Sequence, residues 1–167
     1  MTQRVTRSGR GVLALVPTEP LHRSPAERVH FCGHCGRQPD EAPDSRVCPS
    51  CGLGLLLETT AEAAPGEGGA FVLIDSTMAV CGVSAAAEEL LATCETEAVN
   101  HHLTELLVPA DAEAQGPANL AVAVTWAARG DDEIRRTFVR PAKTFGVRLK
   151  ARIASCNSPD AALIVLD

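Results

Sequence analysis

Two short cysteine motifs constrain the fold of this chain more than any other feature. The segments CGHCG at 32–36 and CPSCG at 48–52 share the form C-x-x-C-G. Two residues between thiolates let one tight turn direct both sulfurs at a single ion, and the glycine that follows can adopt the positive φ of such a turn. Two such turns that face each other form a tetrahedral site of four sulfurs, which suits zinc.

This pattern resembles the zinc-ribbon family over about residues 29–57. The resemblance implies a structural Zn²⁺ ion held by Cys32, Cys35, Cys48 and Cys51. Four thiolates leave no open coordination position, so the site is expected to be structural and not catalytic. Redox-active dithiols and unpaired thiols are the alternatives. The Gly and Pro residues that follow the cysteines disfavour a thioredoxin-like motif, which needs a strand before it and a helix after it. His30 and His34 are expected to be solvated neighbours of the site.

The rest of the composition indicates a globular, cytoplasmic protein. Hydrophobic residues make up 46% of the chain, which is enough for a core. The apolar run at 12–16 is too short for a signal peptide, and no run approaches the length of a membrane span. In a reducing compartment, paired cysteines bind metal more often than they form disulfides. The net charge of −6 argues against a protein that coats nucleic acid over its whole surface.

Composition divides the chain into four segments. Residues 1–30, with five Arg against two Glu, are expected to form a basic, flexible arm, and residues 31–58 are expected to form the zinc ribbon. Residues 59–69, TTAEAAPGEGG, have the small and turn-forming residues of a linker. Residues 70–167 form one mixed domain, so the fold class is α+β.

Periodicity predicts strands and helices in a defined order within 70–167. Two strands at 71–75 and 78–83 form a hairpin, and Ser84 caps a helix over 85–93. Helices follow at 99–108 and 119–129. Strands are then predicted at 133–140, 145–155 and 161–166, and the second of these alternates apolar and basic residues.

This order of elements, with the segments FVLIDSTMAVCGVSAAAEELLATCE and NHHLTELLVPAD, resembles the PAS family over 70–167. The resemblance implies a five-stranded antiparallel sheet with helices on one face. It also implies either a bound small ligand or an empty domain that docks a partner or forms a homodimer. Flavin-binding members have a reactive Cys on the helix matched to 99–108, and haem-binding members have a His on the helix matched to 119–129. Both are missing here, so neither cofactor is expected and the cofactor-binding residues stay unknown.

Several other residues could bear chemistry, but each has a simpler interpretation. Cys81, Cys94 and Cys156 lie in apolar or strand contexts, which predicts small buried side chains instead of redox sensors. Trp126 is expected in the core or in a pocket wall. His101 and His102 are adjacent on a predicted helix, so they point in different directions and are interpreted as solvated or satisfied side chains, not as metal ligands.

Basic residues are concentrated in one part of the acidic C-terminal domain. Residues 134–152 contain seven basic residues and no acid. Arg148, Lys150 and Arg152 would form a basic stripe on the outer face of the sheet. This stripe either docks an acidic partner, such as the ribbon of the same chain, or is an ordinary solvated face.

These features favour a regulatory protein over an enzyme. The sequence contains no nucleophile–base arrangement, Gly-rich phosphate loop or supported carboxylate pair. The leading hypothesis is a sensory or regulatory adaptor that signals through protein partners. One alternative is a DNA-binding transcription regulator that uses the ribbon and Arg4, Arg7 and Arg10. Another is a redox sensor whose thiols release zinc on oxidation.

Overall fold

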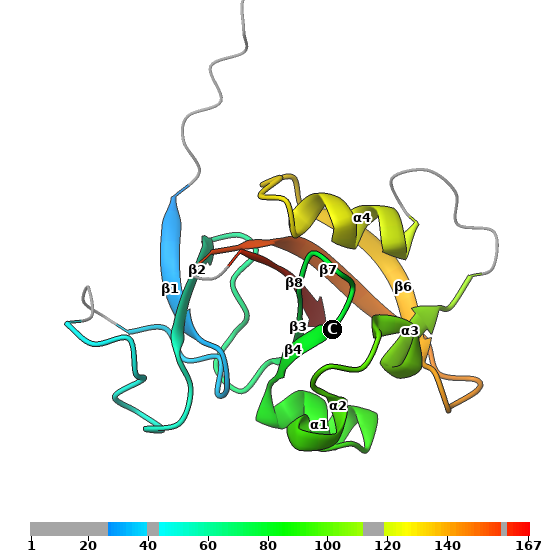
Figure 1. The fold of residues 1–167 in the computed structure, drawn as a ribbon, viewed down its shortest axis with the longest axis horizontal. Helices are drawn as coiled ribbons and strands as arrows, with labels where there is room; N and C mark the ends of the chain where they lie inside the picture. Colours follow the sequence, from blue (N-terminus) through cyan, green and yellow to red (C-terminus); the bar gives the residue numbers. More distant parts are fainter. Residues whose placement is uncertain (1–26, 40–43, 112–118, 158–159) are drawn as a thin grey trace, which may run out of the picture.

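The computed structural model describes residues 27–39, 44–111, 119–157 and 160–167, which form one small and one large antiparallel sheet with short helices (Figure 1). The small sheet pairs β1 (Arg28–Cys32) with β2 (Leu56–Thr60). The large sheet has the order β4-β3-β8-β7-β6-β5. Its strands are β3 (Ala70–Ile74), β4 (Val80–Val83), β5 (Leu107–Pro109), β6 (Arg135–Pro141), β7 (Leu149–Cys156) and β8 (Ala161–Leu166).

The helices share one face of the large sheet. They are α1 (Ala85–Leu91), α2 (Glu95–Ala98), α3 (Leu103–Leu106) and α4 (Leu120–Ala127). Buried residues of all four helices pack with one side of β3, β4, β6, β7 and β8 in a single apolar cluster. Leu103 and Val124 in this cluster have no exposed surface, and neither has Ile164 at the centre of the sheet. Burial of these side chains drives the helices onto the sheet.

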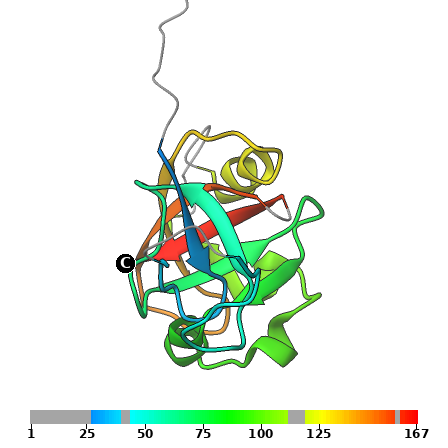
Figure 2. The same ribbon diagram turned by 90° about the vertical axis from the view of Figure 1, so that its left-hand side faces the viewer.

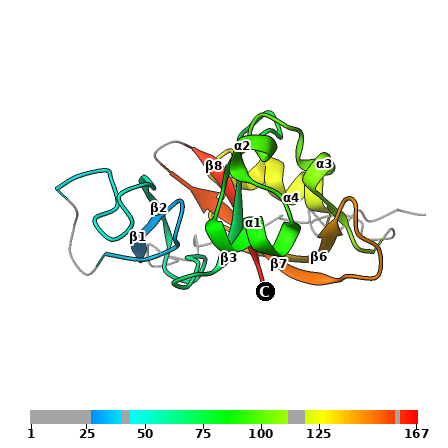
Figure 3. The same ribbon diagram turned by 90° about the horizontal axis from the view of Figure 1, so that it is seen from below.

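The β1–β2 hairpin packs on the other face of the large sheet. A second cluster joins Phe31 of β1 and Leu57 of β2 to residues of β3, β7 and β8. The rings of Phe31 and Phe71 meet edge to face, with centroids 5.6 Å apart. Figure 2, viewed from the hairpin side, shows the hairpin in front of the large sheet. Figure 3 shows the molecule from below, with the β1–β2 hairpin at one end and the helices toward the other. The cysteine-bearing segment is therefore part of the same packed body as the sheet.

The segment 59–69, predicted as a linker, is packed against the rest of the molecule. Thr59 and Thr60 are the last residues of β2, and Ala63 and Ala64 are buried. The Thr59 hydroxyl donates to the carbonyl of Ser155 on β7 at 2.7 Å. These contacts bring β2 against β7, so a composition typical of linkers does not prevent a segment from joining a core.

The helix after Ser84 forms as predicted, because Ser84 satisfies its first turn. The Ser84 Oγ accepts the Ala87 N–H at 3.2 Å, and the helix spans Ala85–Leu91. The same oxygen accepts the Phe71 N–H at 2.9 Å and donates to the Gly69 carbonyl at 3.1 Å. Ser84 thus ties α1 to the start of β3.

The single helix predicted at 99–108 is wrong. Asn100 has φ 69°, and His102 is extended and caps α3. The His102 side chain accepts the Thr104 N–H while Glu105 accepts the His102 N–H, which is a capping box. The helix is therefore only Leu103–Leu106, and the chain continues directly into β5.

The large sheet has six strands in place of the five expected. The additional strand, β5, pairs with β6 and places Leu107 opposite Pro141. The strand predicted at 145–155 begins only at Leu149, because Gly146 has φ 76° and belongs to the turn. Phe145 is consequently 82% exposed and does not point into the core. The strand predicted at 161–166 is confirmed with the same bounds.

Arg148 and Arg152 of the basic stripe pair with acids of the same chain, and so does Arg136 on the neighbouring strand β6. Arg136 contacts Glu62 at 3.0 Å, and Arg152 contacts Asp167 at 3.2 Å and donates to the Glu62 carbonyl at 2.9 Å. Arg148 contacts Asp111 at 2.7 Å and lies over the Phe138 ring. Glu62 lies just after the β1–β2 hairpin, so part of the stripe meets the neighbouring segment of its own chain. The main contact of the hairpin itself is the apolar cluster around Phe31.

No helix within the described part of the chain is both long and apolar enough to span a membrane.

Candidate metal centre

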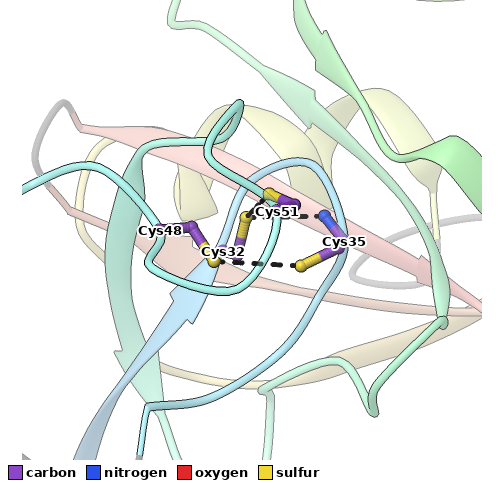
Figure 4. Close-up of side chains that lie close together, drawn as sticks. All are labelled: Cys32, Cys35, Cys48 and Cys51. Atoms are coloured by element: carbon purple, nitrogen blue, oxygen red, sulfur yellow. Dashed lines mark hydrogen bonds between the residues drawn. The ribbon is translucent and has the colours of Figure 1, made fainter.

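The four predicted cysteines converge on one point (Figure 4). Cys32 ends β1 and Cys35 lies in the turn after it, while Cys48 and Cys51 lie in the second turn, before β2. The Cys32 and Cys51 sulfurs are 3.6 Å apart, the Cys35 and Cys48 sulfurs are 4.0 Å apart, and all four lie within 4.8 Å of one another. These four residues form the one group of ligand-type side chains suited to a metal ion among the described residues.

Both turns have the backbone that the C-x-x-C-G pattern predicts. Gly36 has φ 73° and Gly52 has φ 68°. The Gly36 N–H donates to the Cys32 carbonyl at 3.0 Å, and the Gly52 N–H donates to the Cys48 carbonyl at 2.9 Å. The two motifs therefore fold as near copies of each other, and each presents two sulfurs to the same point.

Gly54 is a site residue that the sequence reasoning missed. Its carbonyl accepts the Cys48 N–H at 2.8 Å, and its N–H approaches the Cys51 sulfur at 3.5 Å. A Cβ at this position would overlap the Cys32 sulfur and crowd the backbone of His34. Gly54 thus allows the two turns to approach closely. The one feature of the sequence that could mark Gly54 as part of the site is its position, three residues after the last cysteine of the motif.

The spacing of the sulfurs fits a tetrahedral metal site. Zn–S bonds of about 2.3 Å place neighbouring sulfurs of a tetrahedron about 3.8 Å apart. The two close pairs, at 3.6 and 4.0 Å, bracket this value. Cys32 and Cys48 are buried and Cys35 and Cys51 are half-buried. The site can therefore hold a soft or borderline metal ion with little movement of the chain.

The protein environment divides the thiols into two that resist ionisation and two that favour it. Burial raises the pKa of Cys32 to about 12 and raises that of Cys35 as well. The N–H groups of Gly54 and Leu53 lower the pKa of Cys51 to about 6. Burial opposes ionisation of Cys48, but the N–H groups of Cys51 and Ser50 and the Cys32 thiol together outweigh it, so the pKa of Cys48 is also lowered.

This asymmetry means that metal binding must release protons. Metal ligands are thiolates, so an arriving ion displaces protons from the Cys32 and Cys35 thiols at neutral pH. Affinity for the ion consequently falls as the pH falls. The lowered pKa values of Cys48 and Cys51 make these two thiols easier to deprotonate than Cys32 and Cys35, whose thiolates need the positive charge of the ion.

Backbone hydrogen bonds and one side-chain pair fix the site to the rest of the molecule. The Gly33 N–H donates to the Leu55 carbonyl at 2.8 Å, which joins the two turns. The Ala85 N–H donates to the His34 carbonyl at 3.1 Å, which joins the first turn to the start of α1. Arg37 donates from Nε to Glu67 at 2.9 Å, so the segment before β3 is also held against the site.

The described histidines lie outside the cysteine cluster, but His30 and His34 are half-buried and not solvated as expected, and His102 is a helix cap and not part of a helix. His30 and His34 lie beside the cysteine cluster and are not members of it. His101 and His102 are exposed. His101 pairs with Glu105 at 3.0 Å, which lowers the pKa of the Glu105 carboxyl, and His102 caps α3.

The remaining cysteines differ from the prediction at two of three positions. Cys156 is buried, and burial raises its pKa to about 12. Cys81 and Cys94 are exposed. Cys81 is exposed because the pairing of β3 with β4 slips by one residue beside it, which leaves Cys81 as the extra residue of a β-bulge. Trp126 is also 46% exposed and packs under the guanidinium of Arg135 at 4.6 Å.

No protein-family model matches this sequence, and a comparison with curated proteins finds no significant match.

Proposed function

We propose that this chain is a non-enzymatic regulatory adaptor in which a structural zinc centre is built onto a PAS-like domain. The observation that supports this most strongly is the closed set of four cysteine sulfurs within 4.8 Å of one another. A metal ion with four thiolate ligands has no open position for a substrate, which favours a structural role. Zinc is the proposed ion because it prefers tetrahedral sulfur sites and does not change its oxidation state.

The PAS-like assignment is supported by the arrangement of the large sheet. Its strands β4, β3, β8, β7 and β6 are neighbours in antiparallel pairs, and the helices pack on one face. These are the features that the resemblance implies. The three-residue strand β5 is an addition at one edge.

Signalling by contact is favoured over tight binding of a large ligand beneath the helices. The helices meet the sheet through side chains that are fully buried, among them Val72, Leu103 and Val124. A domain packed in this way transmits changes through its surface, and the β1–β2 hairpin on the opposite face provides one such surface. The proposed partners are proteins, and the proposed location is the cytoplasm.

A combined experiment on the purified full chain tests the adaptor proposal. We expect one zinc ion per chain in native mass spectrometry, no flavin or haem absorbance, zinc retention after mild peroxide, and no retention on DNA at low salt. Zinc release by peroxide would contradict the structural role in favour of a redox sensor. Salt-dependent retention on DNA that is lost on neutralising Arg4, Arg7 and Arg10 would contradict it in favour of a transcription regulator.

A further inference from the structure

An apolar cleft lies between the cysteine turns and the edge of the large sheet. It has a volume of about 540 Å³, within the usual range for ligand sites. The hairpin side of the cleft is formed by Leu53, Leu55 and Leu57, and the sheet side by Leu73 and Cys156. The hydrogen bond from the Ala85 N–H to the His34 carbonyl ties the first cysteine turn to the start of α1, which directly follows the edge strand β4.

The apolar surface continues out of the cleft onto the second cysteine turn. Leu53 is 75% exposed and Leu55 is 50% exposed, and Val47, which bridges to Leu55, is 45% exposed. Large aliphatic side chains that are exposed side by side mark a surface that another apolar group covers. A small molecule inside the cleft would leave Val47 and part of Leu53 in water, so a polypeptide segment fits this surface better.

The surroundings of the cleft are acidic. Glu95 of α2 lines it and accepts the Val83 N–H, and Glu88 of α1 lies beside Glu95 because its carboxylate accepts the Glu95 N–H. Residues 47–128 contain no Lys or Arg at all. A segment that docks here should therefore combine aliphatic side chains for the cleft with cationic side chains for its rim.

The chain itself contains such a segment before β1. Residues 12–16 read VLALV, and Arg7 and Arg10 precede them. These residues lie outside the described part of the structure. Eleven residues lie between Val16 and Arg28, and the twelve steps from one to the other can span up to about 40 Å when extended. The five steps from Arg28 along β1 to the cleft residue Gly33 cover only about 17 Å. We propose that residues 12–16 dock in this cleft, with Arg7 and Arg10 toward the acidic helices.

Because residues 12–16 belong to the same chain as the cleft, the docked state would be populated even if the contact is weak. A short tether gives its segment an effective concentration of about 1 mM, so a contact with a dissociation constant near 0.25 mM would protect the cleft about fivefold. A partner protein with a similar basic and aliphatic segment would compete for the same surface. Binding of that partner would then displace residues 12–16 from the cleft.

Two exposed cysteines allow a direct test on the full chain. Cys81 lines the cleft, whereas Cys94 is exposed but does not line it. With zinc bound to its four ligands and Cys156 buried, Cys81 and Cys94 are the exposed thiols that N-ethylmaleimide can alkylate. Partial burial of the Cys81 sulfur raises its pKa to about 11, so Cys81 reacts slowly and each site is compared only with itself across variants. The rate at each site is followed by mass spectrometry. We compare the wild type with Leu13→Asp/Leu15→Asp, and use Thr2→Asp/Thr6→Asp as a control that adds the same charge outside the apolar run.

The proposal predicts that Leu13→Asp/Leu15→Asp raises the Cys81 rate about fivefold and leaves the Cys94 rate unchanged, while the control variant behaves as the wild type. A synthetic peptide of residues 5–18, added to the Leu13→Asp/Leu15→Asp protein, should slow Cys81 again, and a scrambled peptide should not. Equal Cys81 rates in wild type and variant, or no effect of the peptide, would overturn the proposal. Protection of Cys81 that grows with protein concentration would overturn it in favour of a second copy.

Discussion

Replacing Phe31 by Ala tests whether the cysteine-bearing hairpin and the large sheet form one cooperative body. Phe31 has no exposed surface, and its ring meets Phe71 edge to face at 5.6 Å. Truncating a buried Phe to Ala costs about 3–5 kcal/mol, since apolar contact is lost and a cavity remains. A folded domain is stable by only about 5–15 kcal/mol, so we expect the variant to lose a large part of its free energy of unfolding.

The assay is urea unfolding of the zinc-loaded protein, with the same free zinc concentration for each variant. With an m-value of about 2 kcal/mol/M, the loss should lower the midpoint by about 2 M. Phe145→Ala is the matched control, because Phe145 is 82% exposed and should change stability by no more than about 0.5 kcal/mol. The wild type should unfold in one transition by both tryptophan fluorescence and circular dichroism.

A double-mutant cycle isolates the contact across the interface. Phe31→Leu and Phe71→Leu remove the ring pair from its two sides, and the coupling between them should be about 0.5–1.5 kcal/mol. A cost for Phe31→Ala below about 1 kcal/mol would refute the reasoning. Two separate transitions in the wild type would also refute it, because the hairpin would then be an independent domain as the composition of 59–69 suggests.

Three further predictions concern stability away from the metal. Ser84→Ala should lower the free energy of unfolding by about 2 kcal/mol in urea melts, because its hydroxyl bonds Phe71, Gly69 and α1; a loss below about 0.5 kcal/mol would contradict the role given to it. Stability measured from pH 9 to 10.5 should fall less steeply in Cys156→Ala than in the wild type. The unfolded Cys156 thiol ionises near its ordinary pKa of 9.0 while burial holds the folded one near 12, so each pH unit costs up to about 1.4 kcal/mol; identical slopes would show that the thiol is not protected. The triple variant Arg148→Glu/Lys150→Glu/Arg152→Glu should keep the oligomeric state of the wild type in native mass spectrometry and lose about 1–2 kcal/mol of stability, because exposed ion pairs contribute little each. A shift between monomer and dimer would restore the docking hypothesis for this face.

The parts that could be predicted from sequence are those fixed by local chemistry. The C-x-x-C-G motifs determine their own turns, and Gly36 and Gly52 have the positive φ that the pattern demands. Ser84 begins α1 because a side-chain oxygen at that position satisfies the first turn. The run at 161–166 is apolar on both faces and lies in the sheet between β3 and β7, with all its residues buried.

The parts that could not be predicted depend on contacts distant in sequence. The exposure of Cys81 results from a bulge that only the pairing with β3 defines. The helix expected at 99–108 is shortened because Asn100 turns the chain and Leu107 finds a partner strand in β6. The cleft beside Leu53 exists only because the hairpin packs across the sheet, and no local pattern signals that arrangement.

Native mass spectrometry of the purified full chain tests the central claim most directly. The account predicts one zinc ion per chain, a mass that corresponds to thiols deprotonated by the metal, and loss of the ion in Cys32→Ser and Cys48→Ser but not in the matched control Cys94→Ser. X-ray absorption should then show four sulfurs at about 2.3 Å from the zinc. A chain that stays metal-free in zinc-containing buffer, or that keeps its zinc when Cys32 is replaced, would contradict the account.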